Sequence, residues 1–179
     1  MSFGKRCSAI LLVQALVGYE WFASGLTKLV HGDFPGGLRS ALGEMSGGAP
    51  GFYRSFLETA VIPHAQAFGY AVELGELLLG VVLIGGAALA VLGRGGRGPA
   101  LALVAAAAAG LFLAVNLELA NGAHFGLPIA GDSFDEGIDL DTIMVGLQLV
   151  LLGSAVAALR VARPRVSVAR IAHVFASLR

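Results

Sequence analysis

The chain has 179 residues, of which 56% are hydrophobic and 13% are charged, and its formal net charge is zero. A soluble domain has about 45–50% apolar and about 25% charged residues, and the apolar excess here is gathered in blocks, which predicts membrane spans. A single cysteine, Cys7, excludes an internal disulfide framework and a multi-cysteine metal site. We expect lipid contact and no nucleic-acid partner.

Four segments are long and apolar enough to cross a bilayer as helices of about 20 residues. The first also resembles a signal peptide, but Glu20-Trp21-Phe22 makes a poor cleavage region, so we interpret it as a retained helix. The fold class predicted is therefore an all-α integral membrane protein, with residues 1–179 forming one four-helix bundle. The predicted spans cover about 8–30, 65–92, 99–120 and 140–161.

The connections between the spans differ in length. A Gly-rich stretch at 93–98 can only be a tight turn, so the second and third spans should be antiparallel neighbours. Residues 31–64 should form a longer loop, with one short helix from Leu38, a break at 47–50, and a second helix through Phe56. The tail at 164–179 predicts a basic amphipathic helix on the anionic inner leaflet, or a docking helix for a cytoplasmic partner.

Basic residues lie mainly on one side of the predicted topology. Nine of the twelve Lys and Arg residues fall in the N-terminal segment, the tight turn and the tail, and none of the twelve acidic residues joins them. The positive-inside rule then predicts a bacterial inner-membrane protein with both termini in the cytoplasm. The long loop at 31–64 would face outward.

Three glutamates lie inside these apolar segments. Counted from the predicted outer boundary at about 1.5 Å per residue, Glu20, Glu73 and Glu76 lie about 13, 12 and 16 Å deep. Ionisable residues within a membrane usually pair, hold a proton or serve a function. This coincidence of depth predicts a polar cluster beside a cavity that opens toward the outer side.

Glu73 and Glu76 are three residues apart and share one helix face. Two such carboxylates in a low-dielectric region should not both be ionised, so we expect one to hold its proton. A carboxyl of this kind beside an amphipathic cavity suits quinone or quinol chemistry. The alternative is a structural network, in which Lys28 or Arg54 neutralises one glutamate.

Other polar and aromatic side chains fall near this level. Gln148 is expected at a similar depth, Asn116 nearer the outer end of its span, and Trp21 too deep for the interfacial belt, which suggests cavity lining around Glu20. Glu118 should simply be solvated. The histidines lie at span ends, so we expect no haem, which would need ligands within the bundle, and we expect no metal site.

Two stretches carry a family resemblance. One is Gly18–Leu29, which ends in a Gly-x-x-Lys step; the other combines residues 52–63 with Val72–Gly80, which contains Glu-Leu-x-x-Gly. Together they resemble the DoxX-like membrane proteins, which include the DoxD-type subunit of thiosulfate:quinone oxidoreductase. The resemblance implies a four-helix membrane subunit linked to sulfur or thiol oxidation and to quinone. It matches Lys28 to the family's first-helix lysine, and Glu76 with Gly80 to its second-helix pair.

These observations lead to one main hypothesis and two alternatives. The main one is a membrane subunit of a redox complex that contributes to a quinone site near the outer side. In it Glu20, Glu73 and Glu76 handle protons, Lys28, Trp21, Asn116 and Gln148 contact the cofactor, and a partner subunit supplies electrons. The first alternative is a non-catalytic membrane anchor or assembly subunit. A small-solute carrier is the weaker second alternative, because four helices without an inverted repeat make a sparse transporter.

Overall fold

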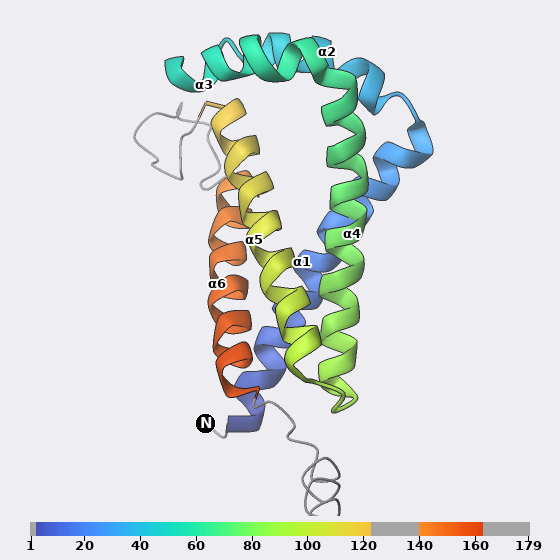
Figure 1. Cartoon of the computed structure of the whole chain (residues 1–179), viewed down its shortest axis with the longest axis vertical. Helices are drawn as coiled ribbons and strands as arrows, with labels where there is room; N and C mark the ends of the chain where they lie inside the picture. Colours follow the sequence, from blue (N-terminus) through green and yellow to red (C-terminus); the bar gives the residue numbers. More distant parts are fainter. Residues whose placement is uncertain (1–2, 123–139, 163–179) are drawn as a thin grey trace, which may run out of the picture.

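The computed structural model describes residues 3–122 and 140–162, and these are helical apart from short connections (Figure 1). The described part of the chain is all-helical, as predicted, and four of its helices are long and apolar enough to cross a membrane. The predicted tail helix at 164–179 lies outside the described residues. The four long helices are α1 (Phe3–His31), α4 (Ala65–Val91), α5 (Arg97–Ala120) and α6 (Leu140–Val161).

The four helices pack mainly as two pairs, α1 with α4 and α5 with α6. The pairs are joined by the tight turn between α4 and α5, where Gly93 has a φ of +66° that favours glycine. One apolar core runs through the bundle and draws residues from all four helices. It contains Val17, Trp21, Leu79, Leu83, Ala106, Ala107, Ala114, Met144 and Leu151.

Glycines set the close approach of α1 to α4. A Cβ atom on Gly80 would lie 2.5 Å from the Cβ of Phe22, and one on Gly25 would lie 2.7 Å from the backbone nitrogen of Leu77. Neither position has room for a larger residue. Small residues allow this backbone-to-backbone packing in membranes, where no hydrophobic force drives helices together.

Residues 34–64 form a roof of short helices across one end of the bundle (Figure 1). In order these are α2 (Phe34–Met45), α3 (Gly51–Phe56), a π-helical turn η1 (Leu57–Val61) and a short 3-10 turn η2 (Ile62–His64). The expected start at Leu38 was wrong, because Pro35 occupies the first turn of α2, where a missing N–H costs nothing. We call this end of the bundle the roof end and the opposite end the turn end.

The roof is fastened to the long helices at two places. Pro35 lies against Gly69 of α4, where a Cβ would come within 2.6 Å of the proline Cα. Tyr53 donates a hydrogen bond of 2.8 Å to the side-chain oxygen of Asn116 on α5. Arg54 donates instead to the backbone carbonyls of Ser46 and Gly47 within the roof. The roof is therefore a packed part of the fold, and its small apolar core includes Ala120 of α5.

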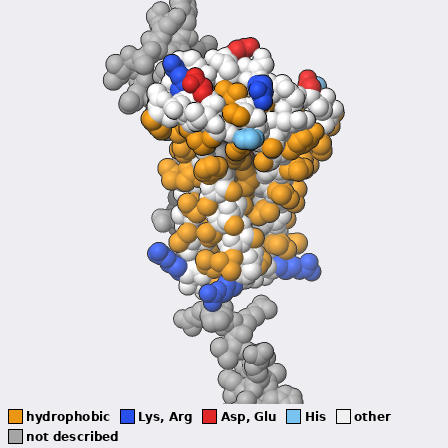
Figure 2. Space-filling view, turned by 45° about the horizontal axis from the view of Figure 1, so that its top comes forward, with side chains coloured by type: hydrophobic (Ala, Val, Ile, Leu, Met, Phe, Trp, Pro, Cys, Tyr) orange, Lys and Arg blue, Asp and Glu red, His pale blue; other side chains and the backbone are white. Residues whose placement is uncertain are grey.

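The surface divides into three zones (Figure 2). Hydrophobic side chains cover the middle of the molecule, while charged side chains of both signs gather on the roof. At the turn end the described charged side chains are basic, and Arg94, Arg97 and Arg160 are all exposed there. An apolar waist between polar ends is the surface expected of a protein that spans a bilayer.

Candidate functional site

Lys28 and Glu76 form an ion pair between α1 and α4. The Lys28 Nζ lies 2.6 Å from Oε2 of Glu76, whose side chain is 2% exposed, and 2.7 Å from Oγ of Ser24 one turn earlier. The ammonium also lies 5.0 Å from the centre of the Phe34 ring at the start of the roof. Because the glycines bring α1 close to α4, a long lysine at this position can reach the buried carboxylate. Ser24 and Phe34 were not singled out in the sequence.

Glu73 lies one turn before Glu76 on the same helix and is only 4% exposed. No hydrogen bond or ion pair joins its carboxyl group to another described residue. Among the described residues, the fully buried polar atoms without a partner belong to Trp21 and Gln148, so the carboxyl oxygens of Glu73 keep some access to the molecular surface. In an apolar region such a group is costly unless it holds a proton or meets a ligand. Lys28 is thus paired with Glu76 and leaves Glu73 unneutralised.

The structure does not bring Glu20 together with the other two glutamates. Gly18 packs against Leu83 and Gly25 against Leu77, so Glu20 is level with about Val81 of the antiparallel α4. That is five residues beyond Glu76, or about 8 Å along the helix axis. Glu20 is also exposed, and no hydrogen bond or ion pair joins it to a described residue. Glu20 therefore does not share the level of Glu76. The reason is that α1 ends six residues beyond Gly25, whereas α4 begins twelve residues before Leu77, so the two helix ends do not lie at the same level.

Trp21 and Gln148 lie in the centre of the bundle with unused hydrogen-bonding groups. Trp21 is 4% exposed and Gln148 is fully buried. Among the described residues, the indole N–H of Trp21 and both amide atoms of Gln148 have no hydrogen-bond partner. Gly110 gives the Gln148 side chain its space, since a Cβ at Gly110 would overlap the amide. Buried polar groups are nearly always satisfied in native proteins, so these two side chains need an explanation.

Two polar residues of α5 have different surroundings from those predicted. Asn116 accepts a hydrogen bond from Tyr53 and donates one of 2.7 Å to the carbonyl oxygen of Phe112, so the roof and its own helix occupy it. The expectation that Glu118 is solvated was wrong. It is 2% exposed and accepts a hydrogen bond of 3.0 Å from Thr142 on α6. The sequence could not show that Glu118 is buried against α6, because α5 is apolar on every side and no side is marked as the packing face.

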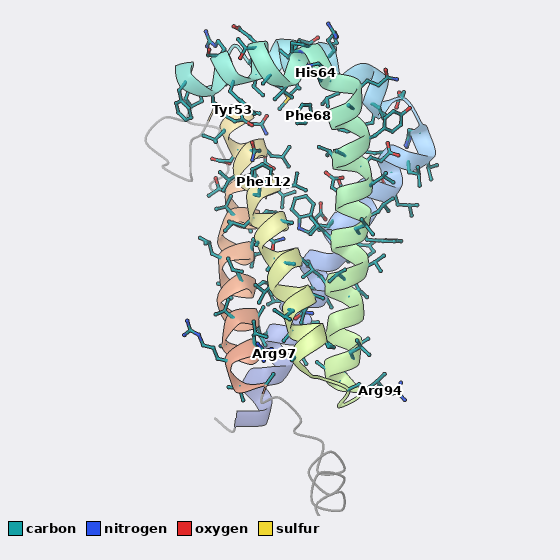
Figure 3. The ribbon with its side chains drawn as sticks, in the orientation of Figure 1. Tyr53, His64, Phe68, Arg94, Arg97 and Phe112 are labelled. Carbon is teal, nitrogen blue, oxygen red and sulfur yellow. The ribbon has the colours of Figure 1, made fainter. Side chains whose placement is uncertain are left out.

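The two described histidines, His31 and His64, lie toward the roof end of the bundle. Figure 3 shows Tyr53, His64 and Phe68 near the roof and Arg94 and Arg97 at the turn end. His31 contacts the carbonyl oxygen of Thr27 in its own helix at 2.8 Å. Within the described residues no group of three or more His, Cys, Asp or Glu side chains is arranged to hold a metal ion.

Comparison of the chain with protein-family models, with curated proteins and with solved structures gave no match. The DoxX-like resemblance therefore stays a prediction from the quoted residues. The polar side chains to be explained are Lys28, Glu73 and Glu76 at the α1–α4 contact, and the unpaired Trp21 in the bundle core.

Proposed function

We propose that the chain is a DoxX-like membrane subunit of a redox complex and contributes to a quinone or quinol site. The observation that carries the proposal is Glu73, a residue that is 4% exposed and whose carboxyl group has no described partner. It lies one turn from a carboxylate that already has its counter-charge. Of the two glutamates only Glu73 needs a further partner. The hydroxyl or carbonyl group of a quinone headgroup is the kind of partner that its carboxyl group requires.

The residues present fit such a headgroup. A quinone supplies two-electron chemistry coupled to the uptake or release of two protons. Glu73 is the group placed to hold or exchange a proton, because Glu76 already pairs with Lys28. The Lys28 ammonium has three N–H groups, and its described acceptors are Ser24 and Glu76, which leaves one N–H for a headgroup oxygen. The unpaired indole N–H of Trp21 is a second donor.

The remaining parts of the proposal concern partners and orientation. In this proposal electrons come from a partner subunit that acts on thiosulfate or another sulfur compound, as the DoxX-like resemblance implies. The three exposed arginines at the turn end support a cytoplasmic location for that end in the bacterial inner membrane. The roof and the Lys28–Glu76 pair then lie toward the outer side, and both termini lie in the cytoplasm.

The test is the quinone content of the protein purified from its native membranes in mild detergent. Wild-type protein should retain quinone, and Glu73→Gln and Glu76→Gln should lose most of it while the complex stays assembled. Glu44→Gln, an exposed change on α2 of the roof, is the matched control and should retain quinone. Wild-type protein without quinone would overturn the proposal.

The non-catalytic anchor is the second candidate, and the Lys28–Glu76 pair favours it. A buried carboxylate neutralised at 2.6 Å is also what a purely structural helix clamp provides. On this alternative, Glu76→Gln dissociates the complex, whereas Glu73→Gln leaves both assembly and activity unchanged.

A further inference from the structure

Glu20 is an exposed carboxyl residue in the middle of α1, a helix long and apolar enough to cross a membrane. Among the described side chains of α1, α4, α5 and α6 it is the only exposed Asp or Glu, since Glu73, Glu76 and Glu118 are buried and Asp141 is half-buried. It lies eleven residues before the end of α1 at His31, or about 16 Å along the axis, too far for a short side chain to reach the interface. An unpaired carboxyl facing lipid at this depth is unfavourable.

The face of α1 that carries Glu20 forms a continuous stripe. Its members are spaced alternately three and four residues apart, as in the seam of a two-stranded left-handed coiled coil. They are the exposed Ala9, Leu12, Leu16, Tyr19, Leu26 and Val30, with the half-buried Ala23. Glu20 follows Tyr19 directly and so flanks the middle of this seam.

A comparable stripe on α4 shows what is special about α1. It contains Ala71, Leu74, Leu78 and Val81, all exposed and all apolar, and lipid tails suffice to cover it. The α1 stripe has the same shape but contains a phenol that is 64% exposed beside a carboxyl group. These two groups are a hydrogen-bond donor and an acceptor on neighbouring positions of one face.

We propose that a second copy of this chain packs in parallel along the α1 stripe, related by a two-fold axis along the membrane normal. In such an interface each contact occurs twice, so Tyr19 of one protomer donates to Glu20 of its partner, and the reverse holds as well. Two copies inserted in the same orientation place these residues at the same depth. The donor and the acceptor on one face make that face complementary to itself, and the pairing removes both carboxyl groups from lipid. The inference is independent of the proposed redox function.

Cysteine cross-linking in native membranes tests the interface. Cys7 is first replaced by serine, and Leu16→Cys then introduces a thiol into the α1 stripe. The Leu16 side chain is 59% exposed in the structure. Because a disulfide requires Cα atoms about 4.4–6.8 Å apart, oxidation should give a product of twice the monomer mass. The matched control is Leu78→Cys on α4, 65% exposed, which should stay monomeric.

Substitutions of Glu20 test whether this residue stabilises the dimer. Glu20→Leu in the Leu16→Cys protein should raise the dissociation constant of the dimer about tenfold, whereas Glu20→Gln should keep most of the cross-linking. Glu20→Leu makes α1 more apolar, so insertion is retained, and an unchanged α-helical circular dichroism spectrum verifies the fold. No cross-link at Leu16→Cys, equal cross-linking at Leu78→Cys, an adduct of another mass, or no effect of Glu20→Leu would each overturn the proposal.

Discussion

Replacing Lys28 with methionine should be the most damaging single change at the α1–α4 contact. It leaves the carboxylate of Glu76, 2% exposed, without its counter-charge. At the 2.6 Å separation the attraction amounts to about 6 kcal/mol for an effective dielectric constant of about 20. Because the Lys28 side chain is 21% exposed, water screens part of this energy. Breaking a buried pair costs about 3–5 kcal/mol, and we expect about 3 kcal/mol here.

The assay is a double-mutant cycle on reversible unfolding in mixed detergent micelles, followed by circular dichroism. Lys28→Met and Glu76→Leu are measured singly and together. The double variant removes both charges of the pair and leaves neither one unpaired, so its loss should be smaller than the sum of the single losses by at least about 2 kcal/mol. Ser24→Ala, which removes only a neutral acceptor of Lys28, should cost about 1 kcal/mol. If the sum of the two single losses equals the loss of the double variant within about 0.5 kcal/mol, the ion pair does not hold the helices together.

Three further changes test the packing and the internal hydrogen bonds by the same unfolding assay. Gly80→Ala should lower the free energy of unfolding by about 1–3 kcal/mol, because its Cβ would meet Phe22 at 2.5 Å. Gly75→Ala is the control and should not lower it, because the space around Gly75 is open. Equal losses for the two variants would contradict the close approach of α1 to α4. Tyr53→Phe should cost about 1 kcal/mol through loss of the bond to Asn116, and the exposed Tyr70→Phe should be neutral. Gln148→Met should leave stability unchanged or raise it by about 1 kcal/mol, because the amide it removes has no described partner; a large loss would reveal one.

The long helices could be predicted because each is an uninterrupted apolar run between breakers. The expected span at 140–161 coincides with α6, and that at 65–92 differs from α4 by one residue. The start of α2 was missed because Pro35-Gly36-Gly37 reads as a break, although proline is favourable in a first helical turn. Local signals thus determine where these helices begin and end.

The direction of a polar side chain could not be predicted in the same way. A helix that is apolar on every side has no marked face, so nothing in the sequence indicates that Glu118 turns toward Thr142 while Glu20 turns outward. The depths predicted for Glu20, Glu73 and Glu76 assume that all spans end at the same level and run parallel to the membrane normal. The sequence predicts Lys28 as one of two residues that could neutralise a glutamate, since a lysine near a span end has the reach to meet a carboxylate on a neighbouring helix, and in the structure that carboxylate is Glu76.

The ion pair also has a consequence for how the chain enters the membrane. Lys28 and Glu76 are 48 residues apart, and all of α2, α3 and most of the first half of α4 must be synthesised between them. At about 5–20 residues per second the ribosome needs about 2–10 s for this stretch. During that time the first helix is present without its counter-charge, so its lysine must stay near the aqueous boundary. Arrival of the second long helix then draws the ammonium against the carboxylate and locks the first pair, before the second pair has been made.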